Sequence, residues 1–141
     1  MQVLKILSDI WKSGADMKLD SDGQIELKNH QLVPAETMKV AEGIFPKIEK
    51  WFQSWKNESS ENITLMKMVH QMCGWQQNDK LNEWLCAEDD SLELFNDWMI
   101  MLAQNGWIDI YSDFRLYAND ESIKMGKELY KRAVMYAKKG A

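Results

Sequence analysis

The spacing of apolar residues constrains most strongly what this chain can fold into. In most of the sequence they recur three and four positions apart, as Leu4, Leu7 and Trp11 do, which predicts helices with one buried face. In two stretches, residues 17–28 and 107–118, they instead alternate with polar residues, which predicts short strands. We therefore expect a mainly helical α+β protein that contains two small hairpins.

Residues 1–56 predict a helix, a hairpin and two further helices. Gly14 ends the first helix, because glycine adopts the left-handed cap conformation without steric cost. The Asp22-Gly23 pair suits the turn of the hairpin. Pro34 suits the first turn of the second helix, and a later glycine and proline separate that helix from the third. The expected order is αββαα.

Residues 57–62 are polar and read as a linker between two modules. Residues 63–141 then predict three helices, a hairpin around Ser112 and Asp113, and a final helix. This α-α-α-β-β-α order resembles a winged-helix unit. We therefore expect an N-terminal module of residues 1–56 and a C-terminal module of residues 63–141.

The negative charge of the chain is concentrated in its middle. Residues 58–90 contain two lysines and seven acidic residues, which accounts for the whole formal net charge of −5. Such a segment repels nucleic-acid phosphates and attracts basic or amphipathic protein surfaces. We therefore expect protein partners before nucleic acid.

The two cysteines and the first helix bear on the compartment. Cys73 and Cys86 both lie in apolar helical sequence, and a chain with this much apolar material needs no disulfide. Lys5, Asp9 and Lys12 interrupt the N-terminal segment, which excludes the apolar core of a signal peptide or membrane helix there. The sequence predicts a reduced, cytoplasmic protein that does not bind a membrane.

No set of residues predicts a metal site or a catalytic site. His70 and Cys73 share a helix face, but with Cys86 they make three ligands, and the other histidine, His30, belongs to the other module. The cysteines are better explained as small buried residues. The acidic run at residues 88–90 precedes a helix, where negative charge stabilises the free N–H groups.

Nucleophilic catalysis is not indicated, since no nucleophile lies in a motif with a base beside it. The seven glycines form no phosphate-binding loop. We expect no catalytic residue, no cofactor and no enzymatic activity.

The N-terminal module resembles a known family. A leucine-rich helix, Gly14, two short strands and the junction Leu32-Val33-Pro34-Ala35-Glu36 before two helices are similar to the TubC-type N-terminal docking domain, over residues 1–55 only. The resemblance implies a homodimerising module that captures a short linear segment of a partner, often as an extra strand on its hairpin.

In that mode, main-chain hydrogen bonds supply affinity, and the charges of the strands select the partner. The charges in question are those of Lys18, Glu26 and Lys28. Since residues 57–141 replace the large catalytic domain that follows such modules in synthetases, we expect a stand-alone adaptor or a protein of a mobile element, such as a phage.

Tryptophan is abundant, with seven in the chain, and large aromatics are enriched in protein interfaces. Trp51 and Trp55 lie one helical turn apart beside the linker and are the preferred interface anchors. An equally weighted alternative is that they seal the first module against the second.

Three functions remain open. The leading hypothesis is a noncatalytic adaptor that docks or dimerises through residues 1–56 and binds a second protein through residues 63–141. A DNA-associated winged-helix regulator is the second, since Lys124, Lys127, Lys131 and Lys138 form a stripe on the last helix. The helix at residues 91–105, however, contains acidic residues and no lysine or arginine. The third is a small inhibitor, encoded by a mobile element, that blocks a host protein.

Overall fold

The computed structural model describes residues 2–139 and divides into two compact units. Unit 1 comprises the chain up to Glu58 together with Cys73–Gln76. Unit 2 comprises Ser59–Met72 and the chain from Gln77 onward. About 70% of the residues are helical and one two-stranded antiparallel sheet is present, which confirms the mainly helical α+β class.

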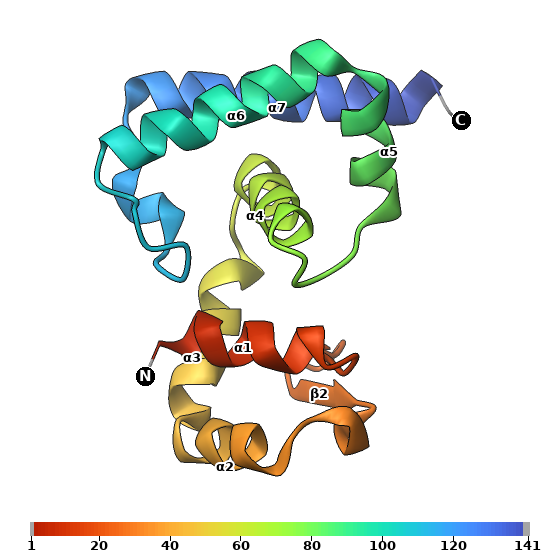
Figure 1. Ribbon diagram of the computed structural model, residues 1–141, viewed down its shortest axis with the longest axis vertical. Helices are drawn as coiled ribbons and strands as arrows, with labels where there is room; N and C mark the ends of the chain where they lie inside the picture. Colours follow the sequence, from red (N-terminus) through yellow and green to blue (C-terminus); the bar gives the residue numbers. More distant parts are fainter. Residues whose placement is uncertain (1, 140–141) are drawn as a thin grey trace. The chain divides into compact units, whose positions relative to one another are not determined.

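Unit 1 has the expected αββαα order (Figure 1). Its core lies under the first helix, where Leu7 and Ile10 are fully buried together with Ile48 of the last helix. The elements are α1 (Val3–Lys12), β1 (Asp16–Leu19), β2 (Ile25–Lys28), α2 (Ala35–Gly43) and α3 (Phe45–Lys56), with a short 3-10 turn at His30–Leu32 before α2.

The hairpin of unit 1 closes through a three-residue loop. Asp20 N–H donates to the Gln24 carbonyl at 2.7 Å, and Gly23 N–H donates back to the Asp20 carbonyl at 3.1 Å. Gly23 has a φ of +79°, which an L side chain rarely adopts, so this position favours glycine. This is a type I turn followed by a left-handed residue, a common three-residue hairpin connection.

Over its described residues, unit 2 consists of four helices and a 3-10 turn, and Figure 1 shows the arrangement of the helices. The longest helix, α7, packs against both α4 and α6. Phe95 and Trp98 of α6 are buried with their rings stacked 5.7 Å apart, and they form the centre of the core. The elements are α4 (Ser60–Met72), α5 (Asp79–Ala87), α6 (Asp89–Gln104), the 3-10 turn η2 (Phe114–Tyr117) and α7 (Asp120–Lys139).

The second hairpin, predicted over residues 107–118, is not formed. This segment is a loop that ends in η2, so within residues 59–139 the structure contains helices and no strand, and the winged-helix order is wrong. Only Trp107 and Phe114 turn inward, against Trp98, whereas Ile108 is 88% exposed and Leu116 is 78% exposed. The alternating residues therefore share no buried face.

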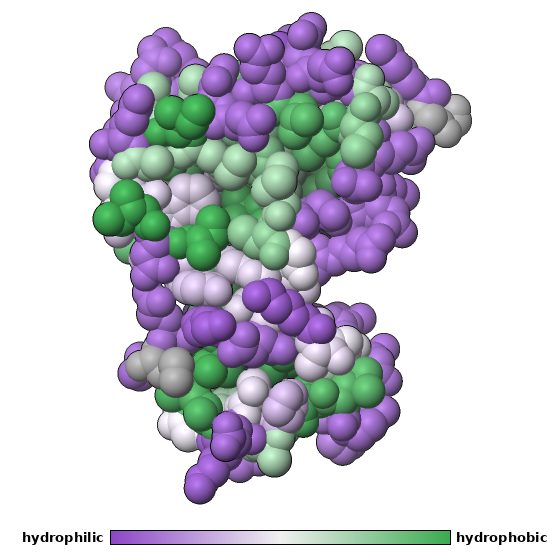
Figure 2. Space-filling model, viewed as in Figure 1, coloured by the Kyte–Doolittle hydropathy of each residue, from purple (hydrophilic) through white to green (hydrophobic). Residues whose placement is uncertain are grey.

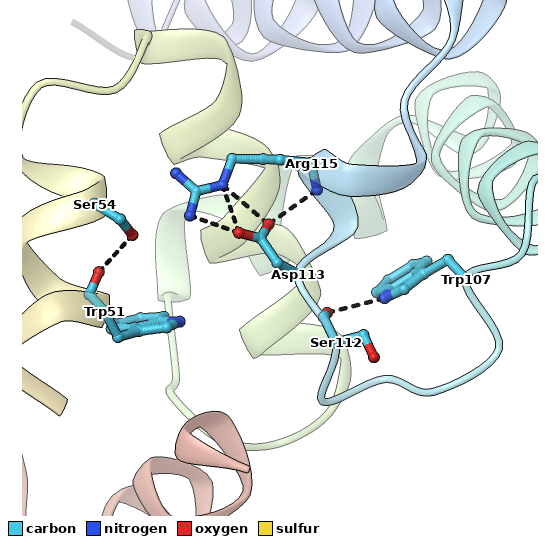
Figure 3. A network of polar contacts seen from close by, with 6 residues as sticks. All are labelled: Trp51, Ser54, Trp107, Ser112, Asp113 and Arg115. Atoms are coloured by element: carbon cyan, nitrogen blue, oxygen red, sulfur yellow. Dashed lines mark hydrogen bonds and ion pairs between the residues drawn. The ribbon is translucent and has the colours of Figure 1, made fainter. Parts of the chain in front are cut away.

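Local hydrogen bonds explain why this loop does not pair as strands. The side chain of Asp113 accepts from the backbone N–H of Arg115 at 2.9 Å and also binds the guanidinium (Figure 3). Asp109 accepts from the backbone N–H of Tyr111 at 3.0 Å. Such bonds use backbone donors that a strand ladder would need. The Trp107 indole completes the loop by donating to the Ser112 carbonyl (Figure 3).

The predicted linker of residues 57–62 is shorter in the structure. Helix α4 already begins at Ser60, so only residues 57–59 connect α3 to α4. The hydroxyl of Ser59 accepts from the backbone N–H of Asn62 at 3.2 Å, as a residue that caps a helix N-terminus does. No helix within residues 2–139 is long and apolar enough to cross a membrane.

Candidate functional site

The hairpin of unit 1 has two outer edges, and α1 covers one of them. The indole N–H of Trp11, in α1, donates to the Met17 carbonyl of β1 at 3.3 Å. Met17 is 4% exposed, so this edge lies within the core of the unit. A further strand therefore has no access to β1.

The outer edge of β2 has a different environment. Because the pair Asp20 and Gln24 is hydrogen-bonded, the alternation of an antiparallel ladder directs the main-chain groups of Ile25 and Leu27 away from β1. Within residues 2–139, no hydrogen bond engages the outward N–H or C=O groups of these two residues. Both side chains are only half-buried. The β2 edge thus offers two outward donors and two outward acceptors.

The sequence-predicted residues Lys18, Glu26 and Lys28 lie together on one face of this hairpin. Lys18 is directly opposite Glu26, and Lys28 is opposite Asp16, so charges of opposite sign face each other across the strands. Ion pairs also run along each strand, with Lys28 Nζ 3.5 Å from Glu26 and Lys18 Nζ 3.8 Å from Asp16. All four side chains are about half exposed.

Asp16 completes this charged face and was missed by the sequence analysis. The sequence indicated that Asp16 shares a face with Lys18, because the two are two positions apart and side chains alternate along a strand. Exposed ion pairs of this kind contribute little stability, about 0–1 kcal/mol each. An incoming strand with matching charges can therefore exchange these pairs at little cost.

Trp51 and Trp55 lie on α3 within a row of aromatic rings in unit 1. Trp51 is 6.1 Å from Trp11, 5.0 Å from Phe52 and 6.2 Å from Trp55, measured between ring centroids. The Ser54 hydroxyl donates to the Trp51 carbonyl on the same helix (Figure 3). Both Trp side chains are half-buried. These three ring contacts lie within unit 1, and the role of Trp51 and Trp55 as interface anchors stays a prediction.

The lysine stripe lies on the outward face of α7. Lys124, Lys127, Lys131 and Lys138 are all exposed. The buried residues of this helix, Ser122, Gly126 and Leu129, occupy the opposite face. No side-chain ion pair within residues 2–139 engages these four lysines. They bring positive charge together on the exposed face of α7.

The titratable residues considered as ligands do not come together. Within the described part of the chain, no three His, Cys, Asp or Glu side chains gather closely enough to hold a metal ion. His70 is buried, Cys73 is half-buried and Cys86 is exposed. Burial raises the pKa of the Cys73 thiol, and the nearby Lys12 ammonium offsets part of this increase.

Large apolar side chains remain exposed on unit 2. Ile100 is 55% exposed, and on the face shown in Figure 2 apolar residues of this unit form a green area bordered by hydrophilic residues.

Comparison of the chain with protein-family models, with curated proteins and with solved structures gives no match. The geometry of the chain itself is therefore what supports a function.

Proposed function

We propose that this protein is a noncatalytic adaptor that docks through the outer edge of β2 and binds a second protein through unit 2. The observation that carries the proposal is the β2 edge itself, whose outward main-chain groups at Ile25 and Leu27 have no hydrogen-bond partner within residues 2–139. An extended segment that pairs with such an edge gains main-chain hydrogen bonds. The similarity of residues 1–55 to TubC-type docking domains supports the same mode.

One occupant of this edge is a second copy of the chain. When two β2 strands pair antiparallel about Leu27, Glu26 of each copy lies opposite Lys28 of the other. Opposite charges face each other twice in this register, and cross-strand pairs of this kind contribute about 0.2–1 kcal/mol each. Pairing between Ile25 and Leu27 would instead place two Glu26 carboxylates together, so we expect the Leu27-centred register.

Charge exchange tests this dimer. Glu26→Lys and Lys28→Glu each place like charges opposite each other in the homodimer, so each variant alone is expected to be more monomeric than the wild type by light scattering. A mixture of the two variants restores both opposite-charge pairs and is expected to form a 1:1 dimer. Each variant also loses an opposite-charge pair within its own hairpin. Mixing the variants does not restore that pair, so recovery of the dimer on mixing reports on the interface between the copies.

The other occupant of the β2 edge is a different protein. A variant that removes an outward main-chain N–H group from this edge tests for such a partner. Ile25→Pro removes the outward N–H group and leaves the inward ladder bonds in place. Ile25→Ala shortens the same side chain but keeps that N–H group. We expect proteins captured by wild type and by Ile25→Ala to be lost with Ile25→Pro. A strictly monomeric protein whose captured partners are the same for all three forms would disprove the proposal.

A DNA-associated role is a second candidate, favoured by the exposure of the four lysines on α7. Contacts of this type bind phosphates without reading sequence, and they weaken steeply with salt. A gel shift at low salt with wild type and with Lys124→Glu/Lys131→Glu tests it. Absence of any retardation of duplex DNA by the wild type would eliminate this candidate.

A further inference from the structure

Unit 2 contains a groove that the sequence analysis did not anticipate. It lies between α4, α5 and α7 and has a volume of about 740 Å³. Ala133 and Ala137 are one turn apart on α7, and their short side chains leave the space open. Leu81 and Trp84 of α5 complete an apolar floor.

The rim of the groove is positively charged although the surrounding sequence is acidic. Lys67 of α4, Lys80 of α5 and Lys139 of α7 line it, against one carboxylate, that of Glu83. None of the three lysines forms an ion pair within residues 2–139. Glu83 is already engaged, because the Tyr136 hydroxyl donates to it at 3.4 Å.

The helix dipole of α5 adds to this positive potential. The backbone N–H of Leu81 donates to the Asn78 side chain at 3.1 Å, so Asn78 caps the N-terminus of α5 where it lines the groove. The N-terminus of a helix carries partial positive charge, which Asp79 in the first turn of α5 offsets in part. An acidic group that enters the groove therefore meets three ammonium groups and this end of α5.

We infer that this groove binds an acidic amphipathic helical segment of a partner protein. Its apolar side chains would pack on Ala133, Ala137 and Leu81, and its carboxylates would face the three lysines. A helix that inserts one apolar face into a groove between helices is a recurring mode of recognition. A simple anion would leave the floor uncovered, and a basic segment would meet like charge.

This inference rests on the second part of the proposed function, the binding of a protein by unit 2, and names the chemistry of the bound segment. It is independent of the β2 edge, because the groove and the hairpin belong to different units. A test with the full chain and a defined probe therefore succeeds or fails separately from the dimer test.

The probe is a fluorescent designed peptide of about 15 residues, long enough for a marginal helix, with leucines on one face and glutamates on the other. A second peptide carries lysine in place of glutamate. Fluorescence anisotropy measures the binding of each peptide to the wild type. We expect the acidic peptide to bind and the basic peptide to bind at least about tenfold more weakly.

Three variants locate the binding. Lys67→Gln/Lys80→Gln removes two rim charges, and Ala137→Phe fills the floor, so each is expected to weaken binding of the acidic peptide about tenfold. The control, Lys124→Gln/Lys131→Gln, removes the same number of charges from the outward face of α7 and should leave binding unchanged. Ile25→Pro, in the other unit, should also leave it unchanged.

Circular dichroism and thermal unfolding confirm that each variant is folded. The charge-only pair Lys67→Gln/Lys80→Gln decides the result if Ala137→Phe does not fold. Equal losses for the rim and control pairs would overturn the inference, because nonspecific attraction would then explain the binding. Absence of acidic-peptide binding to the wild type, or binding that neither the rim pair nor Ala137→Phe weakens, would overturn it too.

Discussion

Glu88 joins α5 to α6 and accepts hydrogen bonds from both helices. Its Oε1 receives the Trp84 indole N–H and the Ser91 hydroxyl, both at 2.9 Å. The Trp84 bond first and then the Ser91 bond lower the pKa of Glu88 from its ordinary value of 4.5. A carboxylate with a lowered folded-state pKa stabilises the folded state above its unfolded pKa, and this contribution is lost as pH falls through the folded value.

Glu88→Gln tests this linkage. We expect the free energy of unfolding of the wild type to decrease as pH falls below 4.5. The decrease should be smaller for the variant, because its amide does not titrate. Urea unfolding at a series of pH values measures both. Glu93→Gln, an exposed carboxylate on α6, is the control. Identical pH dependence in wild type and Glu88→Gln would contradict the assignment.

Gly126 is a close-packing position on α7. A Cβ atom built there would lie 2.9 Å from Leu65 Cδ1 of α4, and Leu65 is itself buried. We expect Gly126→Val to lower the free energy of unfolding by about 1–3 kcal/mol through overpacking. Gly43→Val is the matched control, because a Cβ atom there has nothing within 4 Å. Chemical denaturation measures both variants, and equal effects would refute the packing explanation.

At the scale of single elements, α7 begins with a reciprocal cap. The Asn119 side chain accepts from the backbone N–H of Ser122, and the Ser122 hydroxyl accepts from the backbone N–H of Asn119, both at 2.8 Å. These bonds satisfy donors that an uncapped N-terminus leaves free. The cap therefore marks where the loop of residues 107–118 gives way to the longest helix.

Asn119→Ala is expected to destabilise the protein by about 0.5–2 kcal/mol, the usual cost of losing an N-cap. Asn119→Asp keeps the accepting oxygen and should retain most of the stability. Thermal unfolding compares the two variants. If both lose the same amount, the stabilisation comes instead from the Asn119 amide N–H that donates to Asn105 at 3.3 Å.

At the scale of elements, the two predicted hairpins differ in whether the local sequence was enough to predict them. In the first, a glycine at the left-handed loop position and a row of residues that face the core both favour the hairpin that forms. In the second, Asp109 and Asp113 capture nearby backbone N–H groups, and the alternating apolar residues do not meet a common surface. Alternation alone does not distinguish the two cases.

At the scale of the whole molecule, the division into two units predicts where the chain is first cut. Lys56 is exposed at the end of α3, and residues 57–59 that follow it are not helical. We expect limited trypsin digestion to cut first after Lys56, which mass spectrometry would detect as fragments 1–56 and 57–141. Lys56→Gln should abolish this early cut. Earlier cleavage inside a helix would contradict the prediction.

Charge also has to be considered at this scale. The formal charge summed over residues 58–90 is strongly negative, yet lysines from three helices line the rim of the groove in unit 2. Lys67 and Lys80 are 13 positions apart, and Lys139 lies near the other end of the unit. A count by segment predicts basic partners, whereas the folded surface offers a local site for an acidic one.

The sequence alone determined the helical segments, the first hairpin and the αββαα order of unit 1, because apolar spacing, glycine and capping residues act within a few positions. It also named Lys18, Glu26 and Lys28 as charges of the hairpin strands, and the register of β1 with β2 then showed that they share one face. Only the tertiary structure decided that residues 107–118 form a loop, that α1 covers β1 while the outer main-chain groups of β2 stay unpaired, and that three lysines meet at a groove. These features depend on which distant surfaces pack together, and no local pattern records that.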